Sequence, residues 1–198
     1  MHCVDPPASD VAFSSGVKAL QARHGSRAAY ARMEAAGGWA TRITEELGHF
    51  IARQDSVFLA TASADGQPYV QHRGGPPGFL HVIDAQTLAF AEFDGNRQFI
   101  TQGNLAENPR AQLFLIDYST RQRVKIWGRA RVVEDDPDLV RSLMPPPEYR
   151  ARASRAIVFD VIAWDANCPQ HIPRRVAAIE ARHGLGERGG RILPVRER

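Results

Sequence analysis

The spacing of apolar and polar positions changes near residue 54 of this chain. Before it, apolar positions recur at helical intervals, as in Ile43, Leu47, Phe50 and Ile51. After it, short apolar runs alternate with turn residues, which is typical of strands. The pattern predicts helices over 14–23, 26–35 and 45–53. It predicts strands over 57–62, 67–72, 79–83, 87–93, 110–117, 123–134 and 156–164.

The residues between these runs support the strand prediction. Asp65-Gly66 has the composition of a two-residue hairpin turn. The GGPPG segment at 74–78 predicts a loop rather than the interior of a strand. Gly128, inside a long strand, indicates a bulge or a close approach by another backbone. One helix is expected inside the strand series, over 96–107, and short helices over 138–144 and 175–183. The elements therefore predict an antiparallel barrel interrupted by a helix.

Length and composition narrow the class of protein. With 198 residues, 43% hydrophobic and 24% charged, the chain is large enough for one sizeable core. No apolar run approaches the roughly 20 residues that span a bilayer, and no secretory signal is visible. The two cysteines make a disulfide framework unexpected. We therefore predict a cytoplasmic protein without a membrane partner, formed by a single domain of residues 1–198.

Charge gives little support for nucleic-acid binding. The net charge is only +3, and no run of five or more Lys or Arg residues occurs. A barrel of the OB type that binds nucleic acid would need exposed aromatics on one strand face. Aromatic residues make up only 8% of the chain. We expect no nucleic-acid partner, and anionic small molecules remain candidate ligands.

Three motifs resemble a known family. They are HRGG at 72–75, AEFDGNRQF at 91–99, and NLAENPRAQLFLID at 104–117 followed by RVKIWGRA at 123–130. On these motifs, residues 58–133 resemble the flavin-binding split barrel of the pyridoxamine 5'-phosphate oxidase-like family. The N-terminal helices and the NCPQHIP segment at 167–173 resemble a subgroup of that family rather than the vitamin B6 enzyme itself.

The resemblance implies a fold, a cofactor and an assembly. The fold is mainly β with some helix: a six-stranded antiparallel split β-barrel with N-terminal helices and a short C-terminal helix. Its parts are a helical N-terminal extension at 1–54, the barrel at 55–165 and a C-terminal tail at 166–198. The implied cofactor is FMN, held in a groove between the two subunits of a homodimer.

Several residues suit the phosphate of FMN. A dianion is stabilised by free N–H groups at a helix N-terminus and by arginine and short polar donors. Asn96, Arg97 and Gln98 supply such groups at the predicted start of the helical insert, and Arg73 ends a strand beside two glycines. We predict that Gly74 and Gly75 let the backbone approach the flavin ring. The alternative is an ordinary helix cap beside a solvated arginine.

Further candidates are basic residues on neighbouring strands. His81 is a second candidate for the phosphate, with a position on the barrel exterior as the alternative. His72 and Arg73 must point to opposite faces of their strand. Arg123 and Lys125 share a face, where a cation near the N1/C2-oxygen edge would stabilise the reduced flavin. An exposed basic stripe would give the same spacing.

The C-x-x-H spacing of Cys168 and His171 has no second pair with zinc spacing, so we predict no metal site. A contact of Gln170 or His171 with substrate is an alternative for that segment. The Arg-x-His element that the vitamin B6 enzyme carries near its C-terminus is not present. Pyridoxamine phosphate oxidation is therefore not expected.

We predict an FMN-dependent oxidoreductase that transfers a hydride between flavin and a small substrate or reduced nicotinamide. Such chemistry depends on positioning more than on a protein acid or base, and we name no catalytic residue. The alternative is a non-catalytic module on the same barrel that binds flavin, deazaflavin or haem.

Overall fold

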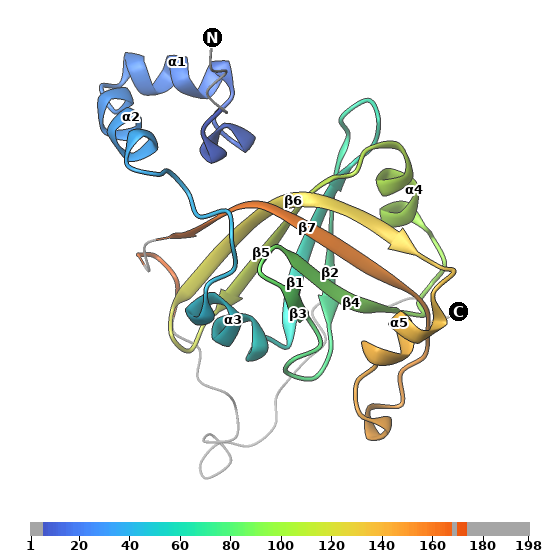
Figure 1. Cartoon of the computed structure of the whole chain (residues 1–198). Coiled ribbons are helices and arrows are strands. Elements are labelled where there is room, and N and C mark those ends of the chain that lie inside the picture. The colour runs from blue at the N-terminus through green and yellow to red at the C-terminus, as the bar shows by residue number, and fades with distance from the viewer. Residues whose placement is uncertain (1–5, 168–169, 174–198) are drawn as a thin grey trace, which may run out of the picture.

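A seven-stranded antiparallel sheet, curved into an open barrel, dominates the computed structural model, which describes residues 6–167 and 170–173 (Figure 1). The strand order is β2-β1-β5-β6-β7-β4-β3. The strands are β1 Ser56–Ala62, β2 Pro68–Gly74, β3 His81–Asp84, β4 Thr87–Phe93, β5 Arg110–Asp117, β6 Gln122–Val133 and β7 Ala153–Asn167.

The prediction of a mainly β split barrel is confirmed. The seven strand ranges predicted from the pattern are all present, whereas the resemblance implied only six strands. Strand β7 is fifteen residues long and pairs with both β6 and β4. Strand β7 thereby joins the β3–β4 hairpin to the rest of the sheet. Strand β2 extends through Gly74, so the loop that was expected from 74 starts one residue later. Strand β3 starts at His81, because Phe79 still closes a turn by donating its N–H to the Pro76 carbonyl.

The helices of the described part are η1 Ala8–Val11, α1 Ser15–Arg23, α2 Arg27–Ala35, α3 Glu45–Ala52, α4 Ile100–Glu107, α5 Pro137–Ser142 and η2 Pro147–Tyr149. The first three predicted α-helices are confirmed within one residue at either end. Helix α4 begins four residues later than predicted. The helix predicted at 175–183 lies outside the described residues. No helix in that part of the chain has the length and apolar character needed to cross a membrane.

Helices α3 and α4 lie at opposite ends of the barrel (Figure 1). Thr44 starts α3 by accepting a hydrogen bond from the Leu47 N–H at 3.2 Å, and two glutamates in the first turn favour the helix dipole. The apolar face of α3 buries Leu47, Phe50 and Ile51 in the main core. This helix therefore closes one end of the barrel, and α4 stands at the other.

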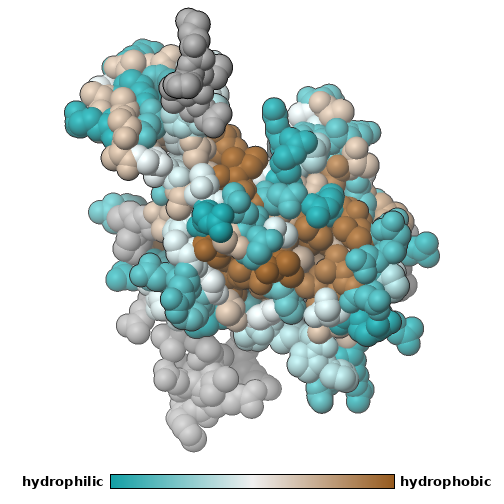
Figure 2. All heavy atoms as spheres, viewed as in Figure 1, coloured by the Kyte–Doolittle hydropathy of each residue, from teal (hydrophilic) through white to brown (hydrophobic). Residues whose placement is uncertain are grey.

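The two faces of the central strands differ in burial. Alternate side chains, such as Leu59 of β1, Leu113 of β5 and Ile126 of β6, point inward and are fully buried. The intervening side chains form an outward face, which includes Phe58, His72, Phe114 and Lys125 as successive cross-strand partners. These outward side chains are half-buried or exposed. Figure 2 shows apolar side chains gathered over the middle of the molecule, with polar ones around them.

The bulge predicted at Gly128 is present, since the register between β6 and β7 shifts between Trp127 and Gly128. A Cβ atom at this position would lie 2.2 Å from the carbonyl oxygen of Asp160. Only glycine permits so close an approach of two strand backbones. The bulge bends β6, the strand that carries both Lys125 on the outward face and Val132 at the core.

Helices α1 and α2 stand apart from the barrel in Figure 1. The chain that follows them attaches to the sheet through Trp39, whose ring stacks on that of Trp127 at 4.6 Å and 10°. Beside this stack, the Trp164 N–H donates to the Ala40 carbonyl at 2.9 Å. The helical extension is therefore fixed to the outer side of β6 and β7.

Candidate functional site

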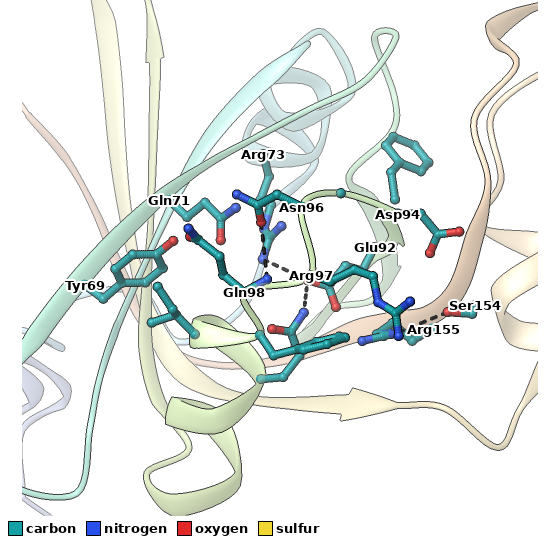
Figure 3. A pocket seen from close by; sticks show the side chains of 15 residues that line it. Tyr69, Gln71, Arg73, Glu92, Asp94, Asn96, Arg97, Gln98, Ser154 and Arg155 are labelled. Atoms are coloured by element: carbon teal, nitrogen blue, oxygen red, sulfur yellow. Dashed lines mark hydrogen bonds and ion pairs between the residues drawn. The ribbon is translucent and has the colours of Figure 1, made fainter. Parts of the chain in front are cut away.

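A cavity of about 560 Å³ opens beside the N-terminus of α4 (Figure 3). Its lining comes from four segments that are distant in sequence. These are Tyr69, Gln71 and Arg73 of β2, Glu92 and Phe93 of β4, residues 94–100 and Gln102 at the start of α4, and Ser154 and Arg155 of β7. The barrel thus brings together the HRGG and AEFDGNRQF motifs in one place.

A buried ion pair lies in the wall of this cavity. Arg73 donates from Nη2 to Oε1 of Glu92 at 2.8 Å, and the two side chains are only 14% and 5% exposed. The same Glu92 oxygen accepts from Nε2 of Gln102 at 2.6 Å. Arg73 also donates to Oγ1 of Thr101 at 3.1 Å, and this hydroxyl donates to Oε1 of Gln71 at 3.0 Å. The network holds Arg73 in one orientation.

Two atoms of this pair are left without partners. Nε of Arg73 and Oε2 of Glu92 are both buried, and neither makes a hydrogen bond within the described residues. Buried polar atoms are almost always hydrogen-bonded, because an unpaired one keeps its full desolvation cost. One donor and one acceptor of this pair are therefore left without a partner among the described residues.

The helix start predicted at Asn96 is wrong, since α4 begins at Ile100. The Asn96 side chain accepts a hydrogen bond from the Gln98 N–H at 3.3 Å, which forms a local turn that competes with helix. Arg97 and Phe99 take left-handed conformations, with φ of 60° and 55°. Non-glycine residues rarely adopt this conformation, and it clusters at ligand sites. Asn96, Arg97 and Gln98 still line the cavity, as loop residues.

The start of α4 itself faces this cavity, which Ile100 and Gln102 line. No side chain caps the helix, so the N–H groups of its first turn have no capping partner. Phe99, which is 43% exposed, lies between two arginines. The guanidinium carbon of Arg97 is 5.9 Å from the ring centroid, and that of Arg155 is 5.2 Å from it. The arrangement presents two cations and a helix N-terminus, which together suit an anion.

The other residues predicted for the site lie outside this cavity. Packing within the chain requires glycine at position 75, because a Cβ there would be 2.6 Å from the Cβ of Phe79. A Cβ on Gly74 would be 3.1 Å from the Asp55 carbonyl oxygen. His81 pairs with Ala89 at the start of β3 and is half-buried. His72 and Arg73 do point to opposite faces, since His72 is exposed and bonds Ser56 Oγ at 2.8 Å.

Arg123 and Lys125 lie at the other end of the barrel. Arg123 lines a second cavity, of about 440 Å³, together with Leu47 and Phe50 of α3. Its Nε atom is buried and makes no hydrogen bond within the described residues. Lys125 lies 3.7 Å from Asp165 and 5.2 Å from the centroid of the Trp127 ring. One copy of the chain therefore does not bring these two cations to the cavity beside α4.

Sequence reasoning missed Glu92, Thr101, Gln102 and Arg155. A signal for Glu92 existed, since it is the one charged residue in the buried run TLAFAEF of β4. Thr101 and Gln102 became part of the site because α4 starts at Ile100, and Arg155 of β7 meets the cavity only through the folded topology. Of the C-x-x-H pair, Cys168 lies outside the described residues, while Gln170 and His171 are exposed. Among residues 6–167 and 170–173 no group of three or more His, Cys, Asp or Glu side chains could hold a metal ion.

Comparison with known proteins agrees with this fold. The family model described as pyridoxamine 5'-phosphate oxidase matches residues 43–183, most of the chain. The protein therefore belongs to the pyridoxamine 5'-phosphate oxidase family, whose members form flavin-binding split barrels. A search of curated proteins found no match.

The solved structures to which this chain is similar are distant in sequence. HupZ of Group A Streptococcus is 18% identical, with a TM-score of 0.50, over 68% of this chain and 99% of its own. General Stress Protein 26 of Bacillus anthracis is 17% identical, with a TM-score of 0.47, over 61% and 91%. An FMN-binding protein of Syntrophomonas wolfei is 15% identical, with a TM-score of 0.44, over 59% and 80%. Of these three, the likeness to HupZ supports the fold.

Proposed function

We propose that the cavity beside α4 binds FMN and that the protein is an FMN-dependent oxidoreductase. It transfers a hydride between the flavin and a small organic substrate or reduced nicotinamide. The observation that carries the proposal is the joint arrangement of Arg73, Arg97 and the uncapped start of α4 around one cavity. Cations and free backbone N–H groups are what a phosphate dianion requires.

The residues present fit FMN. The volume of about 560 Å³ lies within the range of about 300–1,000 Å³ that is usual for small-molecule sites. FMN carries both acceptors, on its phosphate, and donors, on its sugar-alcohol chain, which suits a wall with one free donor and one free acceptor. Asn96, Arg97 and Gln98 would hold the phosphate together with Arg73, whose orientation the Glu92 pair fixes.

When bound, FMN would supply the hydride acceptor and donor. The protein's own part is to bind and orient the cofactor and to limit access of water. None of the described residues that line the cavity is a histidine or a cysteine. Histidine and cysteine are common axial ligands of haem, so this lining does not favour haem at this site.

We propose further that the protein is a homodimer with the flavin at the interface. Apolar side chains on the outward face, such as Phe58, Phe114 and Val70, the last 59% exposed, would be buried by a second copy. The second copy would also supply Arg123 and Lys125 to the polar edge of the flavin. A basic residue there stabilises the reduced ring.

Extraction of the bound cofactor followed by mass measurement tests the proposal. We expect the mass of FMN, absorbance near 370 and 450 nm (about the values of free flavin) and bleaching by reduced nicotinamide without oxygen. A deazaflavin mass, or a Soret band near about 400 nm, would identify the corresponding alternative cofactor. Bound FMN that no reductant bleaches would favour the non-catalytic module. A colourless protein that binds no added FMN would contradict the proposal.

A further inference from the structure

Glu92 is a negative charge in a site that we assign to an anion. Its side chain is only 5% exposed, and it lies on β4 directly after a run of buried apolar residues, 88–91. Apart from fixing Arg73, the carboxylate has no use in binding a phosphate, because it repels a dianion. We propose that Glu92 selects the ligand: its free Oε2 accepts a hydrogen bond from a ligand hydroxyl. This inference rests on the proposed function, in which the hydroxyl belongs to the sugar-alcohol chain of FMN.

The hydrogen bonds of the carboxylate support this role. Oε1 accepts from both Arg73 and Gln102, while Oε2 accepts from neither and is buried. An ionised carboxylate is an acceptor only, so a group that approaches Oε2 must be a donor. The described residues around it supply no donor to this atom. A ligand hydroxyl is neutral, and it can donate one bond here without the repulsion that a phosphate oxygen would meet.

Arg73 adds the complementary requirement. Its Nε–H has no partner, although Nη2 is bonded to Glu92 and to Thr101. The ion pair therefore offers a ligand one free donor and one free acceptor. A phosphate monoester as a dianion, the form that FMN carries, has no O–H group and can satisfy only the donor. A phosphorylated polyol chain carries both kinds of group and satisfies both atoms, so the pair favours such a chain over a bare anion.

The rival role for Glu92 is purely internal: it would only hold Arg73 in place and lower the positive charge of the site. The two roles differ in their effect on ligands that lack the phosphate. If Glu92 contacts a hydroxyl, its replacement weakens the binding of riboflavin, which keeps the polyol chain but has no phosphate. If Glu92 acts only through Arg73, riboflavin binding does not change.

The test is the variant Glu92→Gln, titrated with FMN, riboflavin and sulfate, a dianion without an O–H group. Glutamine keeps one oxygen for Arg73 and Gln102 and replaces Oε2 by an amide NH2 group, which cannot accept. We expect FMN and riboflavin each to bind about tenfold more weakly, the effect of losing one hydrogen bond to a charged group. We expect sulfate, measured by competition with FMN, to bind as well as before or more tightly.

Asp135→Asn is the matched control, because Asp135 carries the same charge, is exposed and lines neither cavity. It should leave riboflavin binding unchanged. The variant Arg97→Ala should weaken the binding of FMN but not that of riboflavin. A ligand-side test does not depend on the variant's folding: the wild-type protein should bind lumiflavin, which lacks the polyol chain, at least tenfold more weakly than riboflavin.

Equal binding of riboflavin by Glu92→Gln and the wild type, or tighter binding by the variant, would overturn the role of Glu92 and leave the proposed function intact. Equal binding of lumiflavin and riboflavin by the wild type would do the same. A wild-type protein that binds none of the flavins would overturn the proposed function, and this inference with it.

Discussion

The two ends of the barrel carry cavities of similar size but different chemistry. The cavity beside α4 is walled by charged and amide side chains, and its central ion pair is almost fully buried. The cavity beside α3 is lined in part by Leu47, Phe50 and Trp164, and its polar residues include Glu46, Arg121 and Arg123. The first has a hydrogen-bond network that fixes the direction of each donor. In the second, the Nε atom of Arg123 has no partner within the described residues.

This difference explains why the predicted site residues separate into two groups. Arg73, Asn96, Arg97 and Gln98 meet at the α4 end, while Arg123 and Lys125 lie towards the α3 end and on the outward face. A binding site that needs both groups requires a second copy of the chain. The comparison therefore connects cofactor binding to assembly, and variants at either end test that connection.

The largest effect is expected at the α4 end, for the double variant Arg73→Ala, Arg97→Ala. FMN affinity should fall at least tenfold, because each charge-assisted hydrogen bond is worth about 1.5–3 kcal/mol. The measurement is a fluorescence titration with FMN. Arg97→Ala alone separates loss of a phosphate contact from the buried charge that removal of Arg73 leaves on Glu92.

Arg129→Ala with Arg131→Ala is the matched control, since both residues are exposed on β6 and line neither cavity. That double variant should bind FMN as the wild type does. Identical titration curves for the Arg73, Arg97 double variant and the wild type would refute the phosphate assignment.

The next effect is expected on the outward face, for Phe114→Glu. Phe114 is half-buried and pairs with Phe58 and Lys125 across the sheet, so a charge there would enter the proposed interface. Association should weaken by about 2 kcal/mol or more, and sedimentation should show monomers at concentrations where the wild type is dimeric. FMN affinity should fall in parallel, because the partner's cations are lost.

Val82→Glu is the control, at a residue of β3 that is 41% exposed and away from Phe114. It should leave both assembly and FMN binding unchanged. A wild-type protein that remains monomeric at micromolar concentration, yet binds FMN tightly, would contradict the shared site.

The smallest effect is expected from Asp117→Asn, in the turn between β5 and β6 that leads to Arg123. Burial alone would raise the pKa of Asp117, but hydrogen bonds from Ser119 and Thr120 outweigh it and hold the pKa below its ordinary 3.8. Since the folded pKa is depressed, the ionised carboxylate stabilises the fold above about pH 4, and this contribution is lost as the pH falls through the folded pKa.

Urea unfolding at neutral pH should show a loss of less than about 1 kcal/mol in Asp117→Asn, because the group is largely solvent-exposed. The difference from the wild type should shrink as the pH is lowered below 3.8. Asp135→Asn, at an exposed carboxylate before α5, controls for the loss of a surface charge. If the stability difference between Asp117→Asn and the wild type grew at low pH, the depressed pKa of Asp117 would be contradicted.

Much of the fold could be predicted from sequence, because local patterns decide it. The alternation in β1 and β5 and the Thr44 cap each depend on neighbours along the chain, and each is present. A turn is present at Asp65-Gly66 as well, but the connection spans residues 63–67 rather than two residues, with the Gly66 N–H bonded to the Ser63 carbonyl. The start of α4 could not be predicted, because a turn at Asn96 and two left-handed residues displace it. Contact of Gly74 and Gly75 with the flavin stays a prediction, and only the structure shows that a Cβ at these positions would crowd Asp55 and Phe79.

The sequence by itself determined the strands, their turns and the family motifs, since hydrophobic period and turn chemistry act over a few residues. Only the tertiary structure decided that Glu92 of β4 meets Arg73 of β2, and that Arg123 lies at the opposite end of the barrel from Arg97. The physical reason is that a buried charge is stable only beside its partner. That partner is brought near by the curvature and strand order of the sheet, which no local pattern specifies.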